Sequence, residues 1–133
     1  MMNKEQGIMN NEINRNKKFD LEERLIEFAI LIIQITENLY NTRAGNHVAG
    51  QLVRSGTSPA LLYGEAQSAE SINDFIHKLK VLLKELRETY IALKIIKKVP
   101  LTSRLDIVEK TITECNELIS IFVKSIETAR KKK

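Results

Sequence analysis

Cysteine, proline and glycine are scarce in this 133-residue sequence, and tryptophan is absent. The single cysteine, Cys115, cannot form an internal disulfide, which excludes a small disulfide-stabilised secreted fold and favours a reducing compartment. Two prolines and five glycines are too few turn residues for a β-sandwich or a β-barrel. These scarcities favour a helical domain.

Long apolar runs are also missing. The longest, residues 28–33, has six residues, against the roughly 20 that a membrane-spanning helix needs. Residues 1–19 contain five asparagines and no apolar stretch typical of a signal peptide. We therefore expect a cytoplasmic protein without membrane contact, in which residues 1–19 form a flexible N-terminal segment.

Apolar residues make up 43% of the chain and recur at steps of three and four, which places them on one face of a helix. The four predicted core stripes are Leu21, Leu25, Phe28, Ile32, Ile35 and Leu39; Val48, Leu52, Ser55, Pro59, Leu62, Ala66 and Ala69; Ile72, Ile76, Leu79, Leu83, Leu86, Tyr90 and Leu93; and Leu105, Val108, Ile112, Cys115, Ile119, Phe122, Ile126 and Ala129. Four such helices with short loops predict an all-α fold, an antiparallel up-down-up-down four-helix bundle over residues 20–129, followed by a basic tail at 130–133. A two-helix coiled coil is the rival, but it would leave two apolar faces in water.

Residues at the expected helix ends support these boundaries. Asp20 suits the N-cap of the first helix, and Ser71 with Asp74 suits the start of the third. Ser103 and Asp106 resemble a capping box for the fourth helix.

Pro59 lies in the middle of the second stripe, where a proline costs a helix about 3 kcal/mol. Either one helix kinks there, or a new helix begins with Ser58 as its N-cap and Pro59 in its first turn. The unbroken stripe favours one kinked helix.

Residue patterns for catalysis, metals and cofactors are weak. The chain has no glycine-rich phosphate loop and no cysteine pair for a zinc site. His77, three residues after Asp74, is the nearest approach to a di-iron motif, but it falls off the apolar stripe. Cys115 sits on the core stripe, which favours an inert buried thiol over a nucleophile. We expect no enzyme activity, catalytic residue, metal or cofactor.

The net charge of +4 is unevenly distributed. Residues 21–70 carry three basic and six acidic side chains, whereas residues 71–100 carry seven basic and three acidic ones. A basic stripe on the third helix, interrupted by Ile91, could follow a phosphate backbone, although a solvated face is the plain alternative. Tyr90 is the one aromatic near it and lies on the core side, so base stacking is not expected. The candidate nucleic-acid-binding residues are Lys80, Lys84, Arg87, Lys94, Lys98 and Arg130.

Four segments carry a resemblance to a known family: residues 51–60 (QLVRSGTSPA), 63–67 (YGEAQ), 71–75 and 84–89 (KELRET). They resemble the "four helix bundle protein" family of bacterial 23S rRNA intervening-sequence proteins, over about residues 20–125. The resemblance implies a bundle with the Ser-Pro segment inside helix two, and ring-like homo-oligomers that are often pentamers. The family is similar to the accessory variability protein of diversity-generating retroelements, a basic pentameric barrel that binds nucleic acid and a reverse transcriptase. It brings no catalytic residues.

The motif residues singled out by this resemblance are Arg54, Ser55, Ser58, Gly64 and Glu65. Small residues here suit close helix packing. Arg54 and Glu65 are eleven residues apart, too far to pair within one helix, so each could reach a neighbouring helix or subunit, or contact a ligand.

The sequence thus predicts a non-enzymatic homo-oligomer, a pentamer by resemblance, that binds RNA or DNA through its basic face. The alternative is a protein-interaction scaffold or accessory subunit with a protein partner and no nucleic-acid binding. Ile91, Ile95 and Ile96 lie beside or off the main apolar line of the third helix, so they could leave apolar surface for a partner.

Overall fold

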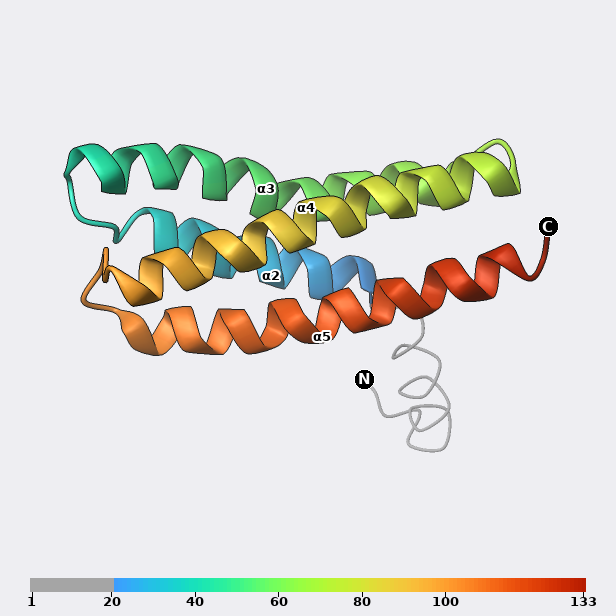
Figure 1. Cartoon of the computed structure of the whole chain (residues 1–133). Helices are drawn as coiled ribbons and strands as arrows, with labels where there is room; N and C mark the ends of the chain where they lie inside the picture. The colour runs from blue at the N-terminus through green and yellow to red at the C-terminus, as the bar shows by residue number, and fades with distance from the viewer. Residues whose placement is uncertain (1–20) are drawn as a thin grey trace, which may run out of the picture.

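The computed structural model describes residues 21–133, which form four α-helices and no strand. The helices are α2 (Leu21–Thr36), α3 (Arg43–Gln67), α4 (Ile72–Lys98) and α5 (Leu105–Arg130). They run in alternating directions, and each packs against the next, while α5 returns to contact α2 (Figure 1). The predicted four-helix bundle is confirmed. The predicted N-terminal segment and the Asp20 cap lie outside the described residues.

The short helix α2 gives the bundle two unequal ends. It has 16 residues, against 25 to 27 in the other helices, so the ends of α3, α4 and α5 extend beyond it (Figure 1). Among the described residues α2 contacts its neighbours α3 and α5, which places it diagonally opposite α4. The outward faces of α2 and α4 therefore point in opposite directions.

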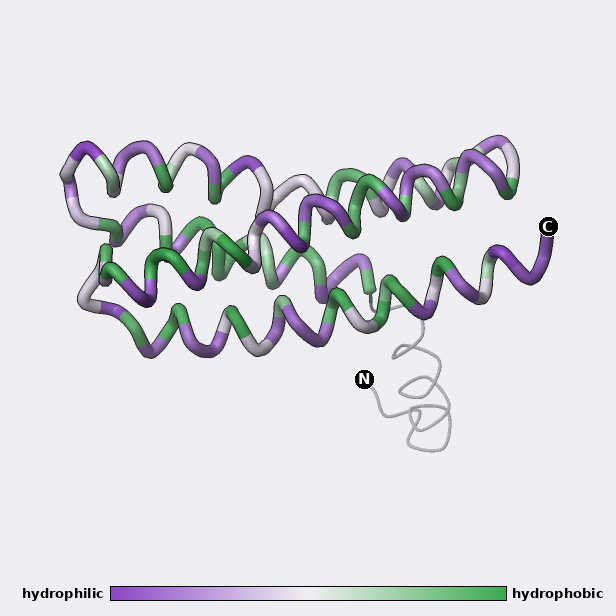
Figure 2. The backbone as a smooth tube through the Cα atoms, viewed as in Figure 1, coloured by the Kyte–Doolittle hydropathy of each residue, from purple (hydrophilic) through white to green (hydrophobic). Residues whose placement is uncertain are grey.

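The core contains most of the predicted stripes, and Figure 2 shows apolar positions recurring along each helix. The prediction for α4 needs correction, because Leu83 and Tyr90 are half-buried and Ile72 is exposed. Fully buried instead are Leu82, Thr89 and Ile96, the last of which was expected at the edge of the core. α4 packs against both α3 and α5, so its buried face is wider than a single stripe.

Close contact between α2 and α3 depends on a missing side chain. A Cβ atom on Gly56 would lie 2.5 Å from Cγ1 of Ile32, which is fully buried. The predicted small-residue packing of the second helix is thus seen at this position.

Pro59 lies inside one continuous helix, so the alternative of a new helix capped by Ser58 is wrong. The proline has no N–H to donate to the Ser55 carbonyl. Nearby, the hydroxyls of Thr57 and Ser58 donate to the carbonyls of Val53 and Arg54, an arrangement that often bends helices. The ribbon of α3 changes direction near its middle (Figure 1).

The helix caps were partly predicted. The Ser71 hydroxyl accepts from the Asp74 N–H (3.0 Å), as expected, and the Thr42 hydroxyl caps α3. The capping box at Ser103 is wrong, because the N-cap of α5 is Arg104, with no side-chain cap. The buried hydroxyl of Thr102 serves this turn instead, accepting from the Arg104 N–H (3.1 Å) and donating to the Asn38 carbonyl (2.8 Å).

None of the helices within residues 21–133 is long and apolar enough to cross a lipid bilayer.

Two glycines of α3 provide a matched test of this packing. Gly56→Ala should destabilise the protein by about 1–3 kcal/mol, because the new methyl group meets the fully buried side chain of Ile32. Gly50→Ala should stabilise it by about 0.5–1 kcal/mol, because no atom lies within 4 Å of that Cβ and alanine favours the helix. Urea unfolding measures both. Equal effects at the two positions would contradict the close contact.

Candidate nucleic-acid interface

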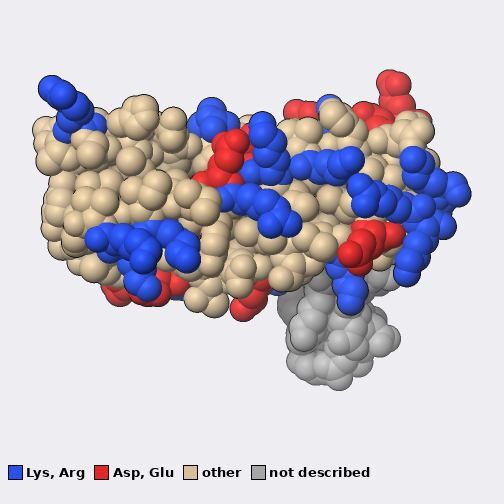
Figure 3. Space-filling model, in the orientation of Figure 1, with Lys and Arg blue, Asp and Glu red and all other residues tan. Residues whose placement is uncertain are grey.

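The middle of α4 and the C-terminal end of α5 bring basic residues together. Lys80 and Arg87 of α4 line a hollow of about 230 Å³ with Arg130 of α5, although 43 residues separate Arg87 from Arg130. Lys84, one turn after Lys80, is exposed beside them. We call Lys80, Lys84, Arg87 and Arg130 the cationic cluster. Figure 3 shows basic side chains gathered over this part of the surface.

The predicted stripe does not continue evenly to Lys94 and Lys98. Three exposed apolar side chains accompany them: Ile91 (57% exposed) and Ile95 (45%) on the C-terminal half of α4, and Val99 (59%) at its C-cap. We call these three the apolar strip, which confirms the expectation of uncovered apolar surface for Ile91 and Ile95.

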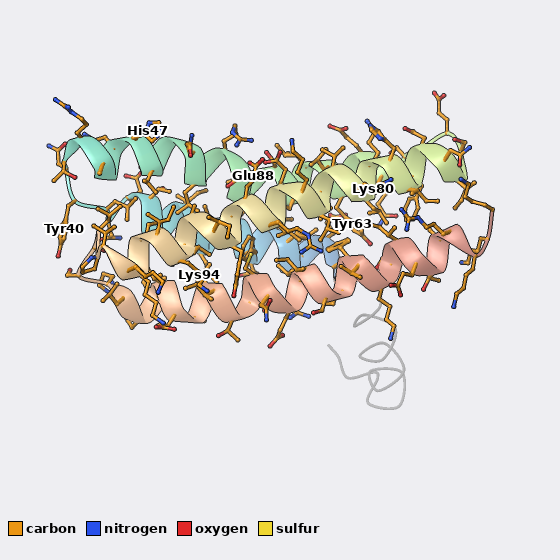
Figure 4. The ribbon with its side chains drawn as sticks, viewed as in Figure 1. Tyr40, His47, Tyr63, Lys80, Glu88 and Lys94 are labelled. Atoms are coloured by element: carbon orange, nitrogen blue, oxygen red, sulfur yellow. The ribbon has the colours of Figure 1, made fainter. Side chains whose placement is uncertain are left out.

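Lys94 contacts an aromatic ring on its own helix. Its Nζ atom lies 5.3 Å from the centre of the Tyr90 ring, a cation–π contact. Figure 4 shows Lys94 and Lys80 on opposite halves of α4. The structure therefore separates the predicted stripe into a cationic cluster and a mixed apolar and basic surface.

Most of the cationic cluster has no carboxylate partner. Within residues 21–133, Lys80, Arg87 and Arg130 form no ion pair, and Lys84 lies 3.9 Å from Glu88. Glu127 also lines the hollow between α4 and α5. Cations that line one hollow without an ion-pair partner favour the binding of an anion there, because the anion offsets their repulsion.

A second, larger hollow of about 820 Å³ lies on the α3 side of α4. Its lining combines aliphatic side chains with both charge signs. It is lined by Gln51, Arg54, Lys80, Leu83, Lys84, Arg87, Glu88, Ile91, Ala92 and Ile95. Lys80, Leu83 and Arg87 thus form a ridge between the two hollows.

Arg54 of the family motif joins α3 to α4. Its Nη1 and Nη2 atoms donate to Glu85 and Glu88, each at 2.9 Å. The hydrogen bond to Glu88 contributes most to raising the pKa of Arg54, and the charge of Glu85 and the bond to it raise this pKa further. Glu85 is buried, so its carboxylate depends on this partner. The structure therefore shows Arg54 in helix packing, the first of the two roles left open by the sequence.

The other motif residues have mixed roles. Glu65 accepts from Nζ of Lys78 on α4 (2.9 Å). Ser55 is buried, and its Oγ accepts from the hydroxyl of Thr89 (2.9 Å). Gly64 is exposed, and a Cβ atom there would meet no neighbouring side chain or helix within 4 Å, so nothing in the structure explains a glycine there. The sequence alone could not have paired Arg54 with Glu85, although both lie in the motif segments.

Neither histidine joins a metal-binding group. His47 and His77 are exposed, and residues 21–133 contain no cluster of three His, Cys, Asp or Glu side chains that could hold a metal. Cys115 is fully buried, and its Sγ lies 3.3 Å from the Leu86 carbonyl. Burial raises the pKa of this thiol to about 12, so the thiolate is scarce at neutral pH.

The buried Ser55–Thr89 contact can be tested by a double-mutant cycle. Thr89→Val should cost about 1–2 kcal/mol, because the Ser55 hydroxyl loses its partner. In a Ser55→Ala background the same change should cost measurably less. Thr113→Val, at an exposed position, is the control and should have little effect. Strictly additive urea-unfolding energies for Ser55→Ala and Thr89→Val would show that the two hydroxyls are not coupled.

Comparisons with known proteins place the chain in a family. A solved structure from Bacteroides thetaiotaomicron VPI-5482, described as a protein with unknown function from the S23 ribosomal protein family, is similar, with a TM-score of 0.72. The two sequences are 30% identical over 79% of this chain and 96% of the other. No model of a protein family and no curated protein matches the chain. At this identity and coverage, the chain belongs to the S23 ribosomal protein family.

Proposed function

We propose that this protein binds the phosphate backbone of RNA or DNA through the cationic cluster, as a homo-oligomer without catalytic activity. The observation that carries the proposal is the convergence of Lys80, Arg87 and Arg130, from two helices, around one hollow. Each phosphate that such cations neutralise releases condensed counterions, which drives binding at low salt. Of the predicted basic tail at residues 130–133, Arg130 ends α5, and the exposed lysines 131–133 follow it directly and add to the same field.

The sequence resemblance supports the same direction. The motif segments around Arg54 and Glu85 resemble the 23S rRNA intervening-sequence proteins, whose relative, the accessory variability protein, binds nucleic acid. In this chain those segments form the contact between α3 and α4, the helix that holds Lys80, Lys84 and Arg87 of the cationic cluster.

Exposed apolar residues support the proposed self-association. Ile26, Ile30 and Ile33 are 37–43% exposed on α2, diagonally opposite the apolar strip of α4. Two different patches on opposite sides suit head-to-tail contacts, which close into a ring when the rotation between copies allows it. A pentamer remains the prediction from the family resemblance.

A second candidate function is a scaffold for another protein. The apolar strip borders the 820 Å³ hollow, whose aliphatic side chains Leu83, Ile91, Ala92 and Ile95 could hold the apolar side of a partner helix. A protein that ignores nucleic acid but co-purifies with a defined partner would favour this function over the first.

Charge removal tests the nucleic-acid proposal. Lys80→Gln with Arg87→Gln should weaken binding of a 24-base-pair duplex and reduce the slope of log K against log salt by about two. The control is Arg43→Gln with Lys110→Gln, which removes the same charge from exposed positions elsewhere. Fluorescence anisotropy at several salt concentrations measures both, with circular dichroism to verify folding. An equal loss in the two variants, or none, would contradict the assigned interface.

Light scattering tests the oligomer. The purified protein should have a mass several times that of one 15.2 kDa chain. Ile91→Glu with Ile95→Glu should lower this mass, because carboxylates in an apolar contact lack partners. Leu61→Glu, on the 70% exposed side chain of α3, is the control. A wild-type mass equal to a single chain would rule the assembly out.

A further inference from the structure

The described aromatic side chains are held away from the cationic cluster. Phe28, Phe122 and Tyr63 are buried in the core. Tyr90 is half-buried, and Lys94 covers its ring. None of these rings offers an open face beside the cluster on which a base could stack.

The two remaining described aromatics, Tyr40 and Phe75, are also unsuited to this role. Tyr40 is 47% exposed, but it lies at the end of the bundle away from Lys80 (Figure 4). Phe75 precedes Lys80 by five residues, a turn of about 140° around the helix, and it lines a separate hollow that also contains Lys124 and Lys132. Proteins that bind single strands rely on base stacking as well as on charge. On this part of the described surface, charge is present but no aromatic ring is available for stacking.

The cations are arranged over an area rather than along a line. Lys80 and Arg87 are two turns apart on α4, a rise of about 10 Å, and Arg130 faces them from α5 across the hollow. α4 and α5 pack against each other, so the spacing of these positions is set by the bundle. A duplex carries one charge per about 1.7 Å of its axis, against about 3.4 Å for one of its strands, and presents two phosphate rows side by side.

We infer that the cationic cluster selects double-stranded over single-stranded nucleic acid, and that it recognises the phosphates without reading the bases. This inference rests on the proposed function and specifies its ligand. Neither hollow beside the cluster is lined by an aromatic residue, so the surface around these cations offers charge without a face for base stacking.

Competition binding tests the selection directly. A labelled 24-base-pair duplex is bound by the full-length protein, then displaced by unlabelled duplex or by either separated strand, at equal phosphate concentration. RNA and DNA versions are run in parallel, together with duplexes of shuffled sequence. We expect the duplex to compete at least tenfold better than either strand, and the shuffled sequences to agree within about twofold.

Variants connect the preference to the cluster. Lys80→Gln with Arg87→Gln should reduce the preference for duplex as well as the affinity, whereas Tyr40→Ala should change neither. Single strands that compete as well as the duplex, with normal salt dependence, would overturn the selection but leave the proposed function standing. Absence of binding to every nucleic acid would overturn both.

Discussion

The buried carboxylate of Glu85 is the constraint on which the exposed surface of this protein depends. A carboxylate at this depth needs a partner, and Arg54 reaches it from α3 at 2.9 Å. Hydrogen bonds hold one side of α4 against α3. Arg54 bonds Glu85 and Glu88, and the next residue, Ser55, bonds Thr89. The rotation of α4 about its axis is thereby set, and Lys80 and Arg87 point outward.

The same contacts distribute the charges. Arg54 draws Glu88 towards α3, and on the other side of the bundle Arg24 binds Glu114 and Glu117 of α5 at 2.7 Å each. The two arginines pair with these three acidic side chains, of which Glu88 also lies 3.9 Å from Lys84 of the cationic cluster. The modest net charge of +4 is therefore compatible with a strongly basic local surface.

Sequence periodicity was enough for the number and order of the helices, because amphipathic stretches of this length can bury their apolar faces only against one another. It was not enough for the full core of α4, where contact with two neighbours buries Leu82, Thr89 and Ile96 as well. The Ser71 cap was predictable from local chemistry, since donor and acceptor lie three residues apart. The turn before α5 was not, because the buried hydroxyl of Thr102 also bonds the distant Asn38 carbonyl.

The sequence by itself determined the all-helical bundle and which residues could carry positive charge, and it favoured a continuous helix through Pro59 without deciding it. These are local properties of periodicity, propensity and side-chain type. Only the tertiary structure decided that Arg54 packs against Glu85. It also decided that Arg130 lines a hollow with Lys80 and Arg87, whereas Lys94 contacts the Tyr90 ring instead. Such pairings depend on the rotation of each helix about its axis, which is set by contacts between residues far apart in the chain.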